Sequence, residues 1–220
     1  MTQKVQLSIG SMKNAAKDFL LQASRTPVKH LYGVTDGKAV GTHVEHAFHV
    51  HLSETYDYVV GSSASGIDFP EINVDLKVTS LKQPQSSCPF RDASQKVYGL
   101  GYSLIVFVYE KVDDAKSQTA LLTFQHAVFV DKERTADFQT TFGLLQTLKN
   151  GGNEDDIVAF LEDKNLPLEE VGRRLLAEKI ITQPPQQGFL TISNALQWRL
   201  QYGRVVAEAG KVDGVEKLLE

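Results

Sequence analysis

Residues 66–79 read Gly-Ile-Asp-Phe-Pro-Glu-Ile-Asn-Val-Asp-Leu-Lys-Val-Thr, and this stretch holds the strongest structural signal in the chain. Its second half, residues 72–79, alternates aliphatic with polar residues, which is the pattern of a half-buried β-strand. Because successive side chains of a strand point to opposite faces, Asp75 and Lys77 are expected to share one face. Three aliphatic side chains fall on the other face and are expected to enter the core: Val74, Leu76 and Val78.

Asp68, Asp75 and Lys77 together form a set of groups suited to phosphodiester hydrolysis. Asp68 precedes the strand and can fold back towards its start, so two carboxylates can bind Mg²⁺, with the carbonyl of Leu76 as a further ligand. The ammonium of Lys77 can orient the attacking water and stabilise the negative charge that develops on the phosphate. An Asp-x-Lys pattern is equally typical of a solvated strand face or a cross-strand ion pair, and the residues alone leave both interpretations open.

Outward from this stretch, the hydrophobic pattern predicts helices, then strands, then helices again. The strands are expected at residues 56–61, 72–79, 102–109 and 119–130. The helices are expected at residues 11–25, 39–52, 133–149, 154–164, 167–179 and 193–208. This order predicts an α/β fold with a restriction-endonuclease-like central mixed sheet flanked by helices, and with a helical C-terminal part.

Length and composition fit a single domain of 220 residues, of which 42% are hydrophobic. We expect a catalytic core at about 37–130 and a helical C-terminal lobe at about 131–220. No apolar run is long enough for a membrane span and no signal-peptide core is visible, while the single Cys88 suits a reducing cytoplasm. The net charge of −4 counts mildly against nucleic-acid binding, but acidic metal ligands and local basic patches weaken this objection.

The segment at 66–79 resembles the catalytic hairpin of the PD-(D/E)XK nuclease superfamily. Asp68-Phe69 and Asp75-Leu76-Lys77 match its two conserved positions, with the same interval between the acids. More narrowly, the segment resembles MutH and MutH-like type II restriction endonucleases, and Val40–Glu45 provides a second match, to their Gly-x-x-x-Glu helix. Gly188-Phe189-Leu190 resembles their closing segment, which approaches DNA. The sequence departs from the pattern at Asp75, where these enzymes often have Glu, although both side chains bind metal.

The resemblance implies a Mg²⁺-dependent endonuclease that cuts double-stranded DNA at a short sequence, with a type II restriction enzyme as the preferred interpretation. The catalytic and metal-binding residues that it implies are Glu45, Asp68, Asp75, Leu76 (through its carbonyl) and Lys77. The stretch 94–109 lies where the family has a basic helix before a central strand, which makes Lys96 the candidate for an additional active-site lysine.

Other activities on the same fold stay open at this point. They are a MutH-like mismatch-repair nickase activated by a partner, a catalytically silent DNA-binding module, and a nuclease of RNA or Holliday junctions. A restriction enzyme could further pair with a second copy of itself as a homodimer, and with a cognate DNA methyltransferase acting on the same site.

Two segments are candidates for DNA contact. The loop at 81–96 is long and polar, and it is either a plain solvated loop or a phosphate-binding one. The predicted helix at 193–208 carries side chains that can reach bases or phosphates. The candidate DNA-binding residues of the two segments are Lys82, Arg91, Gln197, Arg199 and Arg204.

Four histidines lie close together in the predicted helix at 39–52. His43, His46 and His49 follow one another at intervals of three residues, so they fall near one another on a helix and could hold zinc. The alternative is that they line the DNA-facing side near Glu45. His51 falls on the apolar stripe of the helix and is expected to belong to the core.

Overall fold

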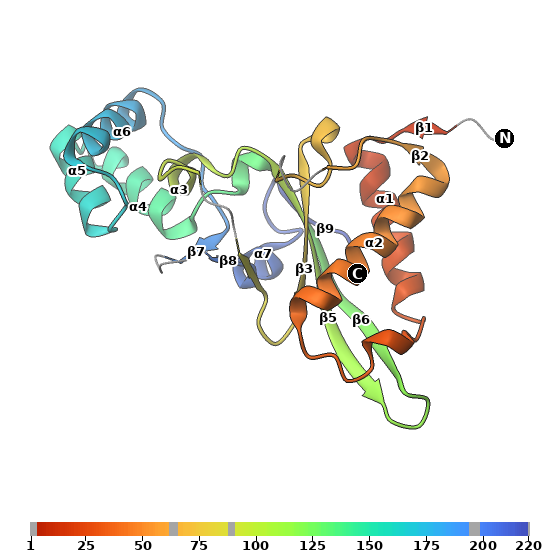
Figure 1. The fold of residues 1–220 in the computed structure, drawn as a ribbon. Coiled ribbons are helices and arrows are strands. Elements are labelled where there is room, and N and C mark those ends of the chain that lie inside the picture. The colour runs from red at the N-terminus through yellow and green to blue at the C-terminus, as the bar shows by residue number, and fades with distance from the viewer. Residues whose placement is uncertain (1–3, 62–65, 88–90, 194–198, 220) are drawn as a thin grey trace.

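The computed structural model of the protein describes residues 4–61, 66–87, 91–193 and 199–219. Its centre is a four-stranded sheet in the order β3-β5-β6-β9 (Figure 1). The strands are β3 (Val74–Ser80), β5 (Ser103–Asp114), β6 (Thr119–Val130) and β9 (Val215–Lys217). The first pairing is parallel and the other two are antiparallel, so the sheet is mixed and β3 lies at its edge.

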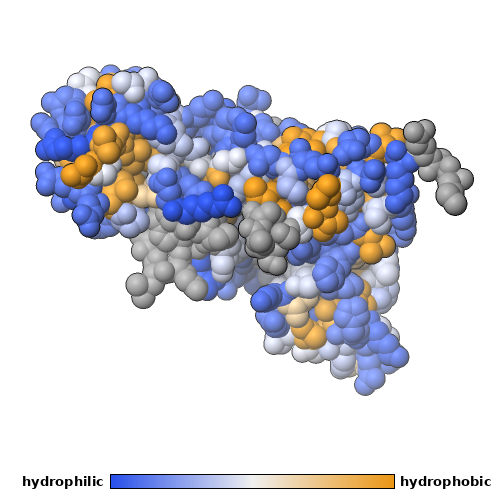
Figure 2. Space-filling view, turned by 45° about the horizontal axis from the view of Figure 1, so that its top comes forward, coloured by the Kyte–Doolittle hydropathy of each residue, from blue (hydrophilic) through white to orange (hydrophobic). Residues whose placement is uncertain are grey.

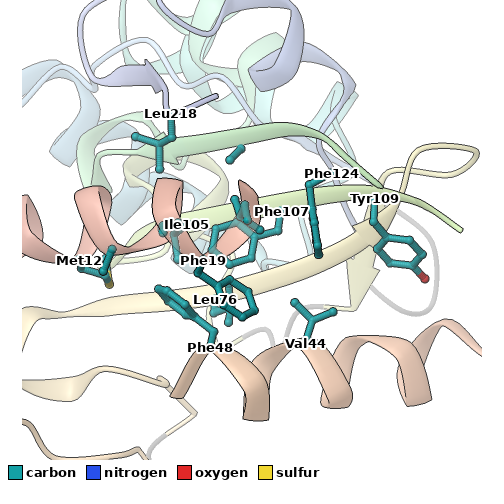
Figure 3. Packing of buried hydrophobic residues seen from close by; sticks show 14 of the residues in the cluster. Met12, Phe19, Val44, Phe48, Leu76, Ile105, Phe107, Tyr109, Phe124 and Leu218 are labelled. Carbon is teal, nitrogen blue, oxygen red and sulfur yellow. The ribbon is translucent and has the colours of Figure 1, made fainter. Parts of the chain in front are cut away.

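Two long helices, α1 (Ile9–Ala23) and α2 (Gly37–Thr55), cover one face of the sheet (Figure 1). Figure 3 shows the core between them, where Phe19 of α1 and Phe48 of α2 meet Phe107 of β5. The ring centroids of Phe48 lie 5.2 Å from those of Phe19 and 5.3 Å from those of Phe107. The buried side of α2 follows the helical period, because its buried residues are Val40, Val44, Phe48 and Leu52.

The opposite face of the sheet is covered by the C-terminal elements, which are α7 (Gly203–Glu208) and a small three-stranded sheet. This small sheet has the order β4-β8-β7, formed by Gln85–Ser87, Arg199–Gln201 and Thr191–Ile192. Its core residues Leu200 and Ile192 join a second hydrophobic cluster with Val106 and Val108 of β5. Side chains of β5 therefore alternate between two cores.

A helical lobe lies apart from both sheets, at the left of Figure 1. It consists of α3 (Gln95–Tyr98), α4 (Phe138–Lys149), α5 (Glu154–Asp163) and α6 (Glu170–Thr182) around a third hydrophobic cluster. Figure 2 shows apolar surface on this lobe, and three of its large apolar side chains are at least half exposed: Phe142, Val171 and Leu175. Among the described residues, no helix combines the length and the apolarity that crossing a membrane requires.

The remaining elements are short. β1 (Val5–Gln6) and β2 (Tyr56–Asp57) form a parallel pair. Three 3-10 turns join larger elements, namely η1 (Lys29–Leu31), η2 (Pro70–Ile72) and η3 (Lys132–Arg134).

The predicted fold class is confirmed, because a central mixed sheet is flanked by helices and the C-terminal region is largely helical. The predicted helix at 193–208 is wrong in its described first part, since Arg199–Gln201 is a strand and the helix begins at Gly203. Leu200 is buried between exposed Arg199 and Gln201, which is a period of two, and this strand pairs on both sides. Residues 194–198 of that prediction lie outside the described residues.

Two other predicted elements are shorter than expected. The strand predicted at 56–61 ends at Asp57, because the backbone beyond it bonds to the next loop: Val59 N donates to Glu71 Oε2 and Gly61 N to the carbonyl of Asp68. The helix predicted at 133–149 begins at Phe138, where the Asp137 side chain caps it by accepting from Thr140 N at 2.9 Å.

Candidate active site

The chemistry of the site begins on β3, whose alternation places acids and aliphatic residues on opposite faces. Val74 and Leu76 are buried in the core under α2, as predicted. Asp75 points to the other face, is only 2% exposed, and has its Oδ2 2.6 Å from Nζ of Lys77. The side chain of Lys77 is 19% exposed, so this ion pair connects a buried carboxylate to an ammonium at the surface of a cleft.

The loop before β3 folds back and brings Asp68 to the free edge of the strand. Phe69 bridges to Val74, and Asn73 closes the intervening 3-10 turn in the left-handed conformation, with φ of 54°. Leu76 N then donates to Asp68 Oδ2 at 2.8 Å, so the carboxylate takes the place of a neighbouring strand. Because N–H and C=O of one strand residue point to the same side, the Leu76 carbonyl faces this edge as well.

A close backbone approach keeps the fold-back in place at Gly61. Its N–H donates to the carbonyl of Asp68 at 2.8 Å. A Cβ atom at Gly61 would lie 1.8 Å from the carbonyl oxygen of Ile67, which no real side chain tolerates. Glycine at this position therefore lets the chain lie directly against the segment that holds Asp68.

Glu45 reaches the same cleft from α2. The helix begins at the N-cap Asp36 and packs Val40, Val44 and Phe48 into the core, which turns Glu45 away from the core towards the edge of β3. Burial, and secondly the negative charge of Asp68, raise the pKa of the Glu45 carboxyl. The Gly-x-x-x-Glu segment and the Asp-Leu-Lys segment, far apart in sequence, thus meet at one site.

The buried acid of this site is poorly compensated. Burial raises the pKa of Asp75 to about 7, although the ammonium of Lys77 works in the opposite direction. Asp75 Oδ2 is fully buried, with Lys77 Nζ at 2.6 Å and the like charge of Asp68 nearby. A buried oxygen in this state is costly for a folded protein, and it fits a position where a cation binds.

These groups line one cleft of about 670 Å³. Its polar lining comes from Glu45, His46, His49, Asp68, Asp75 and Lys77. Within the described part of the chain, no three His, Cys, Asp or Glu side chains converge tightly enough to form a ready-made metal cage. The donor set nevertheless fits Mg²⁺, which typically takes one or two carboxylates and fills its other positions with water and substrate phosphate.

The histidines of α2 diverge and do not form the zinc site that was left open by the sequence. His43 Nδ1 lies 3.1 Å from Nε2 of His30, whereas His46 and His49 line the cleft. His51 is only partly buried, and its ring lies 5.6 Å from that of Phe19. The alternative interpretation, in which histidines face the site near Glu45, thus holds for His46 and His49.

Tyr58 contacts the site through His49, and the sequence interpretation missed this contact. Its hydroxyl donates to the backbone carbonyl of His49 at 3.1 Å and lies 2.9 Å from Nδ1 of the same residue. Because the hydroxyl proton is already used, Nδ1 donates to the tyrosine oxygen, and Nε2 of the neutral ring remains an acceptor. Burial lowers the pKa of His49, which favours that neutral ring. No motif in the sequence connects the two residues.

Lys96 lies elsewhere, at the root of the helical lobe. Its side chain is 3% exposed, and burial lowers its pKa while the nearby Asp137 opposes this effect. Its carbonyl accepts from Asp137 N at 3.0 Å. Lys96 is absent from the described lining of the cleft, so the structure does not bring it together with Asp75 and Lys77.

The candidate DNA-binding residues lie on different elements, and Arg91 is the one that the structure places beside the cleft. A methyl group at Gly66 would lie 3.8 Å from Arg91 Nη2, so this guanidinium stands beside a lining residue. Lys82 is exposed in the turn after β3, and Arg199 is exposed on β8. The guanidinium of Arg204 lies 3.7 Å from the ring centroid of Phe138, and its Nε is buried without a hydrogen bond. Gln197 lies outside the described residues.

Asp75 and Lys77 on the edge strand of a mixed sheet, with Asp68 beside that strand, form the kind of site that suits an endonuclease. A family model described as "Type II restriction enzyme NspV" matches residues 6–217. The chain is also 55% identical over 209 residues to the type II restriction enzyme NspV of Nostoc sp. (strain ATCC 29411 / PCC 7524), which covers 95% of each chain. The protein therefore belongs to the type II restriction enzyme NspV family, and no solved structure gives a significant match.

Membership of this family confirms the predicted enzyme class, a type II restriction endonuclease. It also selects between the activities that the sequence left open, because the nickase and the silent binding module are different classes of protein.

Proposed function

We propose that this restriction enzyme hydrolyses double-stranded DNA with Mg²⁺, through a PD-(D/E)XK site formed by Glu45, Asp68, Asp75 and Lys77. The observation that carries the proposal is the buried Asp75 carboxylate, whose Oδ2 lies 2.6 Å from Lys77 Nζ and whose pKa is raised by burial and by the nearby charge of Asp68. A protein keeps so unfavourable a carboxylate where function requires it.

The residues that would hold the metal are Asp68 and Asp75, with the Leu76 carbonyl and Glu45 completing the oxygen ligands. Asp68 and Leu76 are already joined at the free edge of β3, and Glu45 faces them across the cleft. When bound, Mg²⁺ stabilises the charge on the phosphate and lowers the pKa of a bound water.

Lys77 is the group that we assign to the nucleophilic water. Its ammonium can donate one hydrogen bond to the water oxygen and another to a phosphate oxygen, and so aligns the two. In the reaction the water oxygen bonds to phosphorus and loses a proton, while the P–O3′ bond breaks and the 3′ oxygen gains a proton. The products are a 5′-phosphate and a 3′-hydroxyl. Lys96 stays a predicted additional lysine for this site, although its position in the lobe argues for a structural role.

The candidate basic residues would bind the DNA backbone. Arg91 beside Gly66 and Arg204 on Phe138 present guanidinium groups that suit phosphates, and Lys82 adds a charge at the turn after β3. Gln197 and Arg199 complete the proposed set. These local charges would offset the overall net charge of −4.

The remaining parts of the proposal concern the enzyme's organisation. We expect one endonuclease domain, working in the cytoplasm where its DNA substrate is found. A double-strand break needs two cuts on antiparallel strands, so a symmetric homodimer with one site per strand is the simplest arrangement. A DNA methyltransferase of the same specificity would protect the host's own sites.

The deciding experiment is cleavage of unmethylated phage DNA by the purified protein, with Mg²⁺ or with EDTA. Discrete bands that need Mg²⁺ and disappear in Asp75→Asn support the proposal. Asp18→Asn, an exposed acid on α1, serves as the matched control and should cut normally. Cleavage that persists in EDTA or in Asp75→Asn would refute the assigned site, and single-strand nicks would favour the nickase.

A further inference from the structure

The small sheet β4-β8-β7 has a register that sorts its side chains into two faces. Gln201 of β8 is paired with Gln85 on one side and with Thr191 on the other. The next row joins Leu200 to Ser86 and Ile192, and the last joins Arg199 to Ser87. Directly paired residues point to the same face and successive residues to opposite ones. The rows of Gln201 and Arg199 therefore share one face, and the row of Leu200 has the other.

The row of Leu200 points into the molecule. Leu200 is fully buried and Ile192 is 4% exposed, both in the second hydrophobic cluster. Ser86 Oγ lies 2.5 Å from the hydroxyl of buried Tyr202. With this row fixed inside, the outward face is entirely polar and carries no acid: Gln85, Ser87, Thr191, Arg199 and Gln201.

We propose that this outward face enters the major groove of DNA and reads base edges beside the cut, which makes its residues specificity determinants. The inference rests on the proposed function and extends it to the recognition of the target sequence. The major groove admits a two-stranded β-ribbon, and its donors and acceptors distinguish all four base pairs. Arginine recognises guanine O6 and N7, glutamine recognises adenine N6 and N7, and hydroxyl groups can bond to either.

The exposed side chain of Arg199 is free to contact a base edge in this way. Within the described part of the chain it forms no ion pair, and its side chain is exposed on β8. Its backbone is held by the hairpin, since Arg199 N donates to Ser193 Oγ at 3.1 Å and Ser193 N donates back to its carbonyl at 3.1 Å. A backbone held in this way loses little conformational entropy on binding, and an uncommitted guanidinium breaks no ion pair when it reaches a base.

The small sheet is tied to the catalytic strand at a fixed distance. Thr79 lies on the same face of β3 as Asp75 and Lys77, and its hydroxyl accepts from Gln85 N at 3.0 Å. Strand residues of one face repeat about every 7 Å, so the anchor lies about 7 Å from Lys77 and about 13 Å from Asp75 along β3. Stacked bases are about 3.4 Å apart along each strand, which places the bases read by this face within a few positions of the cut phosphate.

The test uses the full-length protein after its target site has been mapped by cleavage. Cleavage rates are measured for Arg199→Ala and Gln201→Ala on the target duplex and on duplexes in which each purine is replaced by its 7-deaza analogue, which lacks N7. We expect each variant to lose about 10- to 100-fold on the unmodified target. We also expect that, at one purine position, the analogue slows the parent protein but slows the variant no further.

Matched controls come from exposed residues outside both the small sheet and the cleft. Arg25→Ala and Gln125→Ala change an arginine and a strand glutamine of this kind and should leave the rates unchanged. Thermal unfolding of the face variants should match that of the parent, because the replaced side chains are exposed.

Three results would overturn the inference while leaving the proposed function intact. The first is a normal cleavage rate in both face variants. The second is that the 7-deaza analogue slows the face variants as much as the parent at every purine position. The third is a loss of binding in the variants that is the same for target and random duplexes. The last, with a salt dependence reduced by about one charge, would make Arg199 a phosphate contact. If the parent protein cleaves no DNA, that result would instead contradict the proposed function. Selection of bound duplexes from a random pool then still decides the inference, because the parent should enrich a sequence that the face variants no longer enrich.

Discussion

Replacing Asp75 by asparagine should make the protein more stable while removing its activity. The pKa of this carboxyl is raised from 3.8 to about 7, chiefly by burial. Between about pH 4 and pH 7 the folded state therefore holds a proton that the unfolded chain has lost, so this group lowers stability as the pH rises. At about 1.36 kcal/mol per pKa unit, the cost at pH 7 and above is about 4 kcal/mol.

Asparagine keeps the volume of the side chain and removes this cost. The lost ion pair with Lys77 at 2.6 Å needs no separate subtraction, because the pKa of about 7 already includes that attraction. The gain is therefore at most about 4 kcal/mol at pH 8, equivalent to a rise in Tm of up to about 8–16 °C for a chain of this length. The gain should shrink as the pH falls and vanish near pH 4, because the wild-type carboxyl is then neutral in both states.

Thermal unfolding in EDTA at pH 5 and pH 8 measures this effect without interference from divalent cations. Asp18→Asn, which changes an exposed acid of α1, should leave the Tm unchanged at both values. An Asp75→Asn variant that is less stable than the parent at pH 8 would contradict the reasoning. The Asp75 carboxylate would then be stabilised by its surroundings, and the argument for a cation site from its burial would fail.

Three further predictions follow from the same structure. Lys77→Met should lower the cleavage rate by about 10²- to 10⁴-fold while duplex binding persists, because the proposal assigns this lysine to the attacking water; near-normal cleavage would remove it from the mechanism. Phe48→Ala should lower the free energy of unfolding by about 3–5 kcal/mol in urea titrations, since its ring is fully buried between Phe19 and Phe107. Lys96→Met should change Tm and leave the chemical step in single-turnover assays unaltered; a lost chemical step at unchanged Tm would restore its predicted catalytic role.

Strand β3 was predictable because the pattern that defines it is local. Alternation along Val74–Ser80 gives the two faces directly, and the structure places Asp75 and Lys77 on one and the aliphatic residues on the other. The sequence also led us to expect that Asp68 folds back towards the strand, but not that its carboxylate accepts a hydrogen bond from Leu76 N. The bond to Leu76 N exists because β3 lies at the edge of the sheet, and the order of strands depends on long-range packing.

The features that the sequence did not predict depend on contacts between segments that are distant in the chain. The segment at 199–201 is a strand only because β4 and β7 flank it, and three residues are too few to show a period. The contact of Tyr58 with His49 depends likewise on a loop that returns across α2. Lys96 was assigned by its place in a family pattern, whereas the structure puts its side chain beside Asp137 in the lobe.

The position of β3 at the sheet edge explains how one short strand can serve the core, the chemistry and the proposed readout. An interior strand has neighbours on both sides, which would occupy the Leu76 N–H that here holds Asp68. One face of β3 is committed to packing under α2, so the polar residues of the other face are presented at the regular spacing of the strand. Asp75, Lys77 and Thr79 follow one another on that face, and Thr79 holds the first strand of the small sheet. The distance between the cut and the bases proposed to be read is therefore set by the backbone of a rigid strand. An insertion of two residues into β3 between Lys77 and Thr79 would keep every face assignment but would move the two functions apart by about 7 Å.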